Sequence, residues 1–318
     1  VAYDETKELS LDALRAPGGN DWLSYVAGVF WAFASEGLPL HGLDVVVDGD
    51  VPIGAGLSSS AALELATARA LAAATGTAWD PVRMAKLGQK AENEYVGMNC
   101  GIMDQFAVGF GKKDHAIFLN CDTLDYEHVP VNMGMSSLII TNTNKRRGLT
   151  DSKYNERRAE CEKAVELLQP FRPIRNLSEL KSHEISFLEK YIKDPVILKR
   201  ARHVISENGR VLEAVEVLKA NNIRRFGELM NLSHDSLKDD YEVTGNELDT
   251  LVYEGRKLPG VIGTRMTGAG FGGCTVSLVE KDHIHNFITE LGSVYYKITG
   301  LVPDFYQPQT WDGSGILS

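Results

Sequence analysis

The sequence lacks a long apolar run, has few basic residues for its number of acidic ones, and contains only four cysteines. No stretch approaches the roughly 18 consecutive apolar residues of a transmembrane helix, so no membrane-spanning segment is predicted. The 33 Lys and Arg residues stand against 43 Asp and Glu residues, and a net charge of −10 disfavours nucleic acid as a partner. Cys100, Cys121, Cys161 and Cys274 form no C-x-x-C pair, so metal-ligand spacing is absent. We therefore expect a cytoplasmic protein with reduced thiols that binds neither membrane nor nucleic acid.

The composition is otherwise that of a globular protein. Of the 318 residues, 43% are apolar and 24% are charged, which excludes a disordered chain and a small disulfide-stabilised scaffold. Domains commonly contain about 100 to 200 residues, so this length predicts two lobes, each with its own core. The sequence places their boundary near residues 130–136 and so predicts an N-terminal lobe of residues 1–134 and a C-terminal lobe of residues 135–318.

The pattern of apolar residues predicts an α+β fold with both helices and strands. Helices are expected at residues 22–36, 59–74, 80–95 and 282–299, and a helical period runs from 153 to 257 with breaks at Pro170, Pro173 and Pro195. Strands are expected at residues 43–50, 105–110, 116–119, 137–141 and 274–280 and near Phe305. The strand–helix–strand ending favours helices packed on an antiparallel or mixed sheet.

The most informative segment is a loop rich in glycine and serine, between a predicted strand and an Ala-rich helix. It contains Gly54, Ala55, Gly56, Leu57, Ser58, Ser59, Ser60 and Ala61. Glycines permit close backbone approach, and the free N–H groups of a first helical turn attract phosphate. The loop lacks the Gly-Lys-[Ser/Thr] of a P-loop and the G-x-G-x-x-G of a Rossmann turn, so we predict a different kind of phosphate loop. The alternative is a tight turn whose serines only cap the helix.

Two acidic residues are candidates for chemistry on a nucleotide. Glu92 lies near the end of the second predicted helix, and a carboxylate with a loop serine would suit Mg²⁺, which takes few protein carboxylates. Asp104 follows a glycine and precedes a predicted strand, where it could orient an acceptor hydroxyl. Alternatively, Glu92 is a solvated helix residue and Asp104 a turn former. Spacing alone does not bring the two together.

Two further segments have open interpretations. Residues 263–273 form a second glycine-rich segment, which would share a ligand with the first only if the fold brought the two together; it could equally be a bulge or a lid. Residues 144–147 are a short basic run in an acidic protein, with a solvated loop and a phosphate or sugar contact as equal alternatives.

Several motifs together resemble those of one kinase family. They are PIGAGLSSSAALE at residues 52–64, CGIMDQF at 100–106, SHDSLKDDYEVTGNELD at 233–249 and GTRMTGAGFGGCT at 263–275. Over nearly its whole length the chain resembles the galactokinase branch of the family of galactokinase, homoserine, mevalonate and phosphomevalonate kinases. The first and last motifs are similar to family-wide ones, and the other two to motifs specific to that branch.

The resemblance implies a two-lobed α+β kinase. Its N-terminal lobe would hold a mixed sheet and the helix of the phosphate loop, and its C-terminal lobe a ferredoxin-like arrangement of helices on a sheet. ATP and Mg²⁺ would be the cofactors, and the C1 hydroxyl of D-galactose would be the acceptor in galactose catabolism. A monomer or a weak homo-oligomer is expected.

The same resemblance implies roles for particular residues. The ATP phosphates would lie on residues 54–61, and Mg²⁺ would be held by Ser60 and Glu92. Asp104 would face the C1 hydroxyl as the catalytic residue. Gly101, through its backbone, and Tyr154 would contact the sugar.

The chain departs from the family in one respect. A motif resembling G-R-x-N-x-x-G-E-H-x-D-Y, which supplies an arginine at the reacting centre and most sugar-binding groups, is not found, and the first residue is not Met. We therefore expect an N-terminally incomplete kinase, and we expect these 318 residues alone to bind sugar poorly and to be weakly active or inactive. Two alternatives stay open: a kinase for N-acetylgalactosamine or arabinose, and a sensor that binds ATP and galactose without catalysis.

Overall fold

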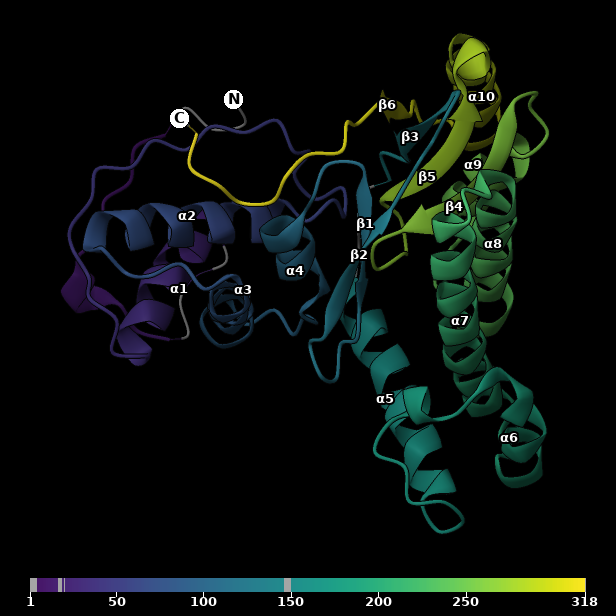
Figure 1. The fold of residues 1–318 in the computed structure, drawn as a ribbon, viewed down its shortest axis with the longest axis horizontal. Coiled ribbons are helices and arrows are strands. Elements are labelled where there is room, and N and C mark those ends of the chain that lie inside the picture. Colours follow the sequence, from purple (N-terminus) through teal and green to yellow (C-terminus); the bar gives the residue numbers. More distant parts are fainter. Residues whose placement is uncertain (1–4, 17–18, 20, 146–149, 318) are drawn as a thin grey trace. The chain divides into compact units, whose positions relative to one another are not determined.

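The chain divides into two compact units. The computed structural model describes residues 5–16, 19, 21–145 and 150–317, without the side chains of residues 150–152. Unit 1 comprises residues 1–130 together with 310–318, and unit 2 comprises residues 131–309 (Figure 1). Residues 310–318, which the sequence assigned to the second lobe, thus belong to the first unit.

Unit 1 is built mainly of helices that pack through apolar clusters. The helices are α1 (Trp22–Ser35), α2 (Ser59–Thr75), α3 (Pro81–Lys90), a π turn (Ala91–Val96) and α4 (Met103–Phe110), preceded by a 3-10 turn (Leu11–Ala13). Local chemistry explains their ends: the Asp80 side chain accepts from two N–H groups of α3, and Gly76 ends α2 in a left-handed conformation. Phe33, Leu65 and Met84 are fully buried between these helices. The helices predicted at 22–36, 59–74 and 80–95 are confirmed.

Two predicted strands of unit 1 are wrong, and so is its mixed sheet. Residues 43–50 form no strand; they pair with no described segment, and the Val46 side chain is 96% exposed. Residues 105–110 belong to α4. In this helix Phe106 and Phe110 lie one turn apart, and their rings stack with centroids at 4.3 Å. A short apolar run does not distinguish a strand from a buried helix. In the described part of unit 1 the only sheet is the antiparallel pair β1 (His115–Leu119) and β2 (Tyr126–Pro130).

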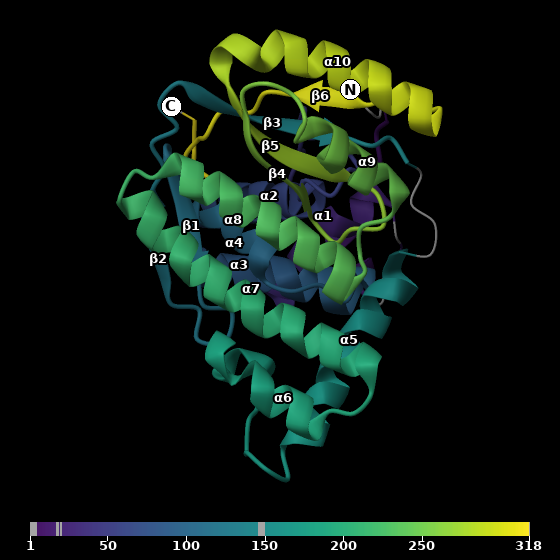
Figure 2. The same cartoon turned by 90° about the vertical axis from the view of Figure 1, so that its right-hand side faces the viewer.

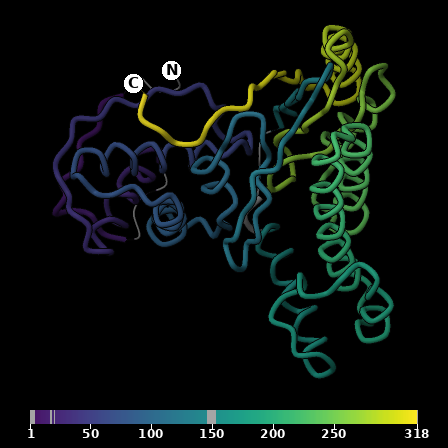
Figure 3. The backbone as a smooth tube through the Cα atoms, in the orientation of Figure 1, coloured from purple at the N-terminus to yellow at the C-terminus, as the bar shows by residue number. Residues whose placement is uncertain are grey.

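The C-terminal residues return to unit 1 (Figure 3). They hydrogen bond to its backbone. The N–H of Gly313 donates to the carbonyl of Gly111 at 2.7 Å, and the N–H of Ser314 donates to the carbonyl of Val108 at 2.9 Å. A Cβ atom on Gly313 would come within 2.6 Å of the Gly109 carbonyl oxygen, so only glycine permits this approach.

Unit 2 contains a four-stranded antiparallel sheet with helices packed on it (Figure 2). The strands β3 (Ser136–Asn142), β4 (Val261–Thr267), β5 (Cys274–Glu280) and β6 (Asp304–Tyr306) lie in the order β4-β5-β3-β6. Together with the helices between them, this order is the βαββαβ arrangement. Side chains of α9 (Asn246–Gly255) and α10 (Ile284–Thr299) share a core with β3 and β5. The predicted strands at 137–141 and 274–280 and near Phe305, and the last helix, are confirmed; the second glycine-rich segment begins within β4 rather than in a loop.

The remaining helices form the rest of unit 2. They are α5 (Thr150–Leu168), α6 (Ile185–Tyr191), α7 (Pro195–Lys219) and α8 (Ile223–Ser236), with 3-10 turns at Leu177–Glu179, Ser182–Glu184 and Lys281–His283 and a π turn at Leu237–Tyr241. The predicted breaks at Pro170 and Pro173 lie between α5 and α6, and the predicted break at Asp194-Pro195 is the start of α7, with Asp194 as its N-cap and Pro195 as its first residue. Gly227 lets α8 approach β4, since a Cβ there would lie 2.6 Å from the Ile262 carbonyl oxygen. Across the described ranges, we find no helix with the length and hydropathy of a membrane span.

Candidate active site

The predicted phosphate loop leads into α2 through a strained turn. Gly54 and Gly56 have positive φ angles of 72° and 77°, and Ser58, which precedes the helix, has φ 60° and ψ 33°. A left-handed serine costs conformational energy, of the kind often stored at functional sites. Within the described chain, the Ser58 side chain makes no capping hydrogen bond to the first turn of α2. Ser58 therefore does not cap the helix through its hydroxyl.

The start of α2 has the physical properties of an anion site. The first N–H groups of a helix have no intrahelical acceptor, and the helix dipole adds a partial positive charge there. Ala61, Leu65 and Leu71 are buried in the core, so the helix is held firmly behind this end. Ser59 and Ser60 are half-buried in the first turn. A phosphate group placed here would meet backbone donors and hydroxyls together.

Glu92 lies in the π turn after α3 and faces this first turn. Its side chain is 7% exposed, so its interpretation as a solvated helix residue is wrong. The Gln105 side-chain nitrogen donates to Glu92 Oε2 at 2.8 Å, and the Cys100 thiol lies 3.4 Å from the same oxygen. Burial raises the pKa of Glu92, and hydrogen bonds from Cys100 and Ser60 offset part of that rise. The structure thus brings Ser60 and Glu92 into contact.

Two buried polar residues of this cluster escaped the sequence analysis. Glu64 and Gln105 are each 0% exposed, and the Gln105 side-chain nitrogen donates to Glu64 Oε2 at 3.0 Å. Burial, and then the nearby Glu92 carboxyl, raise the pKa of Glu64 well above its ordinary value. The one signal in the sequence was spacing: Glu64 follows Ser60 by four residues and so lies on the same helical face.

Asp104 is the second residue of α4 and is half-buried. It begins a helix and does not precede a strand, which corrects the structural context assumed from the sequence. Its negative charge contributes to the raised pKa of both Glu64 and Glu92, so the three carboxyl groups lie near one another. Gly101 is exposed just before α4, and the preceding Cys100 is held by its N–H bond to Asn93 Oδ1 at 2.8 Å.

The cluster has the donor chemistry of a magnesium site with few protein ligands. Hard oxygen donors are available from the Glu92 carboxylate and the Ser60 hydroxyl, and Mg²⁺ usually takes only one or two carboxylates from a protein. No group of three or more His, Cys, Asp or Glu side chains arranged to hold a metal occurs in the described ranges.

The other predicted residues lie in unit 2. Tyr154 is on α5 with its side chain 38% exposed. In the second glycine-rich segment, the N–H of Phe271 donates to the carbonyl of Val243 at 2.7 Å, and a Cβ on Gly270 would overlap that carbonyl oxygen. In the basic run, Lys145 pairs with Glu247 at 2.7 Å, whereas Arg146 and Arg147 lie outside the described residues.

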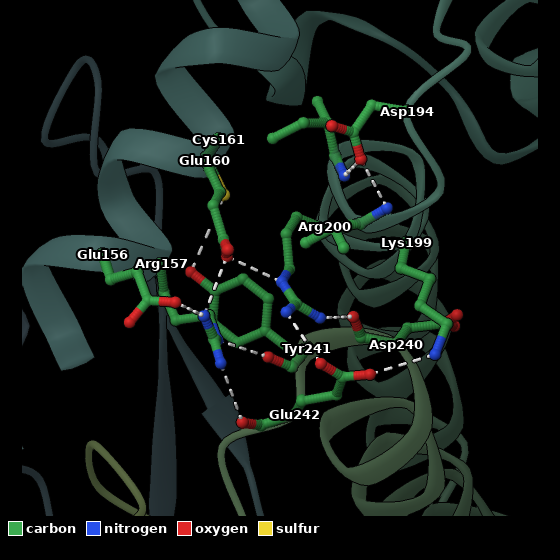
Figure 4. Close-up of polar contacts among 12 residues, drawn as sticks. Glu156, Arg157, Glu160, Cys161, Asp194, Lys199, Arg200, Asp240, Tyr241 and Glu242 are labelled. Carbon is green, nitrogen blue, oxygen red and sulfur yellow. Dashed lines mark hydrogen bonds and ion pairs between the residues drawn. The ribbon is translucent and has the colours of Figure 1, made fainter.

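An ion-pair network holds the turn before Val243 in unit 2 (Figure 4). Arg200, which is buried on α7, donates to Glu160 Oε2 at 2.7 Å, to the Asp240 carbonyl at 2.7 Å and to Glu242 Oε2 at 2.8 Å. From α5, Arg157 donates to Glu160 Oε2 and to the Tyr241 carbonyl, both at 2.9 Å. Glu242 has a positive φ of 55°. This network fixes the segment that contacts the second glycine-rich segment.

Comparison with known proteins places the chain in a family. Residues 24–112 match the GHMP kinases N terminal domain, and residues 214–297 match the GHMP kinases C terminal domain. The chain is 49% identical to a galactokinase of Clostridium acetobutylicum over 96% of its own length and 79% of the relative's, and 46% identical to one of Bacillus subtilis over 97% and 79%.

Solved structures agree with this placement. The structure of Lactococcus lactis galactokinase complexed with galactose is similar with a TM-score of 0.92 and 43% identity, covering 97% of this chain and 80% of that one. A mevalonate kinase, at 20% identity and a TM-score of 0.57 over 90% of this chain and 76% of that one, shares the fold. The two family matches and the close identity to galactokinases lead to one conclusion: the chain belongs to the GHMP kinases and, within them, to the galactokinase family.

Proposed function

We propose that this chain transfers the γ-phosphoryl group of ATP to the C1 hydroxyl of D-galactose. The observation that carries the proposal is the uncapped first turn of α2 beside the buried Glu92 and the nearby Asp104. These residues would give unit 1 a phosphate site, a site for a cation with oxygen ligands, and a carboxylate that faces the acceptor hydroxyl. The named galactokinase relatives, one of them with galactose bound, support galactose as the acceptor.

Binding of the nucleotide would rest on α2. The backbone N–H groups of residues 54–61 and the hydroxyls of Ser58, Ser59 and Ser60 are the donors for the ATP phosphates. Ser60 and Glu92 would hold Mg²⁺, which supplies neutralisation of the charge on the phosphates. Glu92 is buried away from bulk water. Its electrostatic interaction with the metal would therefore be stronger than at an exposed position.

Asp104 would orient the acceptor. Phosphoryl transfer passes through a loose transition state, so positioning the hydroxyl in line with the phosphorus contributes more than removing its proton early. A half-buried carboxylate at the start of α4 can accept a hydrogen bond from the C1 hydroxyl and take its proton late in the reaction. The backbone of Gly101, exposed just before α4, would contact the sugar.

The experiment measures ADP release in MgATP with galactose, using this chain and a chimera. In the chimera, the part of the Clostridium acetobutylicum relative that this chain does not cover is joined to it. We expect galactose-dependent ADP release by the chimera. ATP binding without ADP release by the chimera would favour the sensor instead. A higher kcat/KM for N-acetylgalactosamine or arabinose would favour the related sugar kinases.

A further inference from the structure

Gln105 follows Asp104 in α4 and lies in the interior. The two N–H groups of one side-chain amide are both used on carboxyl groups, since the Gln105 nitrogen lies 3.0 Å from Glu64 Oε2 and 2.8 Å from Glu92 Oε2. Glu64 belongs to α2, Glu92 to the π turn and Gln105 to α4. One side chain thus connects three elements that supply residues to the proposed site.

A neutral amide is well suited to the position of Gln105 between two buried carboxyl groups. Two buried carboxyl groups side by side are costly unless they receive hydrogen bonds. A lysine or arginine would supply such bonds, but its positive charge would compete with a cation for Glu92. The neutral amide of Gln105 donates to both carboxyl groups and adds no charge.

Two oxygen atoms of the cluster, Glu64 Oε1 and Gln105 Oε1, are buried without a hydrogen-bond partner among the described residues. The bonds to Glu92 from Gln105 and Cys100 both end on Oε2. Neither bond uses Oε1. The two bonds therefore fix Oε2 of the carboxylate and leave Oε1 available to other ligands, such as a metal ion.

We propose that Gln105 is a positioning residue for the metal-nucleotide complex: its amide fixes the Glu92 carboxylate against Glu64 and ties it to the turn of α4 that carries Asp104. The inference rests on the proposed function, in which Glu92 holds the metal. Groups that orient a metal ligand from outside the coordination sphere commonly change metal affinity about 10- to 100-fold when they are removed. Gln105 has the position of such a group.

The test measures metal binding directly and does not need turnover. Mn²⁺, which shares the preference of Mg²⁺ for oxygen ligands, is titrated into the chain with a non-hydrolysable ATP analogue, and bound Mn²⁺ is followed by electron paramagnetic resonance. Gln105→Met keeps the length of the side chain and removes both donors. We expect it to raise the Mn²⁺ dissociation constant about 10- to 100-fold, while the affinity for the analogue in EDTA stays within about threefold because the loop of α2 is unchanged.

Two further variants keep the result interpretable. Gln169→Met makes the same exchange in unit 2, where the amide donates to the Ile174 carbonyl, and is expected to leave Mn²⁺ binding unchanged. Gln105→Asn keeps an amide but is one methylene too short to reach both carboxyl groups. It is expected to fold and to weaken Mn²⁺ binding in the same direction as Gln105→Met.

The outcomes separate this inference from the proposed function. If Glu92→Gln abolishes Mn²⁺ binding while both folded Gln105 variants bind Mn²⁺ like the wild type, Glu92 stays a metal ligand and the positioning role of Gln105 is overturned. If Glu92→Gln leaves Mn²⁺ binding unchanged, the proposed ligand and this inference both fail. If neither Gln105 variant folds, as judged by circular dichroism, the residue is structural and the proposal is rejected.

Discussion

At the scale of single residues, Asp104 is the most direct test of the proposed chemistry. Asp104→Asn keeps the shape of the side chain but removes the charge that would orient the acceptor and take its proton. In the chimera we expect kcat to fall about 10²- to 10⁴-fold, with little change in the KM for ATP, because the phosphate loop is not altered. Asp44→Asn, at an exposed position of unit 1, is the matched control and should leave both constants near wild type. An unchanged kcat in Asp104→Asn would remove this residue from the mechanism.

His203 gives a second prediction, on stability against pH. It is buried on α7 with its ring stacked on Tyr241 and its Nδ1 2.9 Å from Ser236 Oγ. Burial lowers its pKa to about 4, an effect that nearby arginines reinforce and Glu207 opposes. The unfolded chain, with a histidine pKa near 6.5, therefore binds more protons than the folded chain between pH 6.5 and 4, and stability is lost as the pH falls through that window.

The expected loss from this one group between pH 8 and pH 5 is about 2 kcal/mol. Urea unfolding of the wild type and of His203→Gln at both pH values isolates the contribution of His203 to the free energy of unfolding, because glutamine can hydrogen bond to Ser236 without titrating. The pH dependence should be smaller in His203→Gln by about that amount. His285→Gln, an exposed change on α10, should not alter it. Equal pH dependence in wild type and His203→Gln would contradict the prediction.

At the scale of elements, the contact between the 242–245 segment and the second glycine-rich segment depends on Gly270. This residue has φ 85°, and a Cβ would overlap the Val243 carbonyl oxygen. Gly270→Ala should therefore add a backbone clash to the strain of a positive φ and destabilise the protein by about 3 kcal/mol or more. Gly300→Ala, with φ 74° and no described atom within 4 Å of the added Cβ, should cost only about 1 kcal/mol. Thermal unfolding of both variants checks the difference; equal losses would show that the contact is unimportant.

Elements with local end signals could be predicted from the sequence, and others could not. Asp80 before Pro81, Asp194 before Pro195, and Gly76 mark helix ends by chemistry within a few residues, and those helices are confirmed. The segment 43–50 has a strand-like composition, but a strand exists only with a partner, and pairing is not encoded locally. β2 (Tyr126–Pro130) was missed because its residues are mostly exposed and show no apolar alternation.

In the candidate site, too, features encoded by neighbouring residues could be predicted and features that depend on tertiary packing could not. The phosphate loop could be recognised because its glycines, serines and following helix are contiguous. Ser60, Glu92 and Asp104 could be named but not brought together, because their proximity depends on how α2, α3 and α4 pack. Gln105 and Glu64 could not be identified as part of the site, since charged and amide side chains are expected to be exposed and it is tertiary contacts that bury these two.

At the scale of the whole molecule, unit 1 is discontinuous in sequence and unit 2 is not. Gly313→Ala should destabilise unit 1 selectively, because the added Cβ would meet the Gly109 carbonyl oxygen at 2.6 Å and displace the Gly313–Gly111 hydrogen bond. Hydrogen exchange should become faster in α4 while β5 keeps its protection. Gly315→Ala, whose nearest neighbour would be 3.7 Å away, is the control. Equal acceleration in both units would show that they unfold together.

The return of residues 310–318 to unit 1 has a consequence for the order of folding during synthesis. A ribosome makes most of unit 1 first, then all of unit 2, and only then the residues whose N–H groups bond to Val108 and Gly111. Unit 2 can therefore complete its contacts as soon as residue 309 has left the exit tunnel, whereas the unit that holds the proposed catalytic carboxylate waits for later residues. Of the two units, the one that is made earlier is thus completed later, and a chain whose translation stops before residue 310 would keep the helix of the phosphate loop in a unit without its last segment.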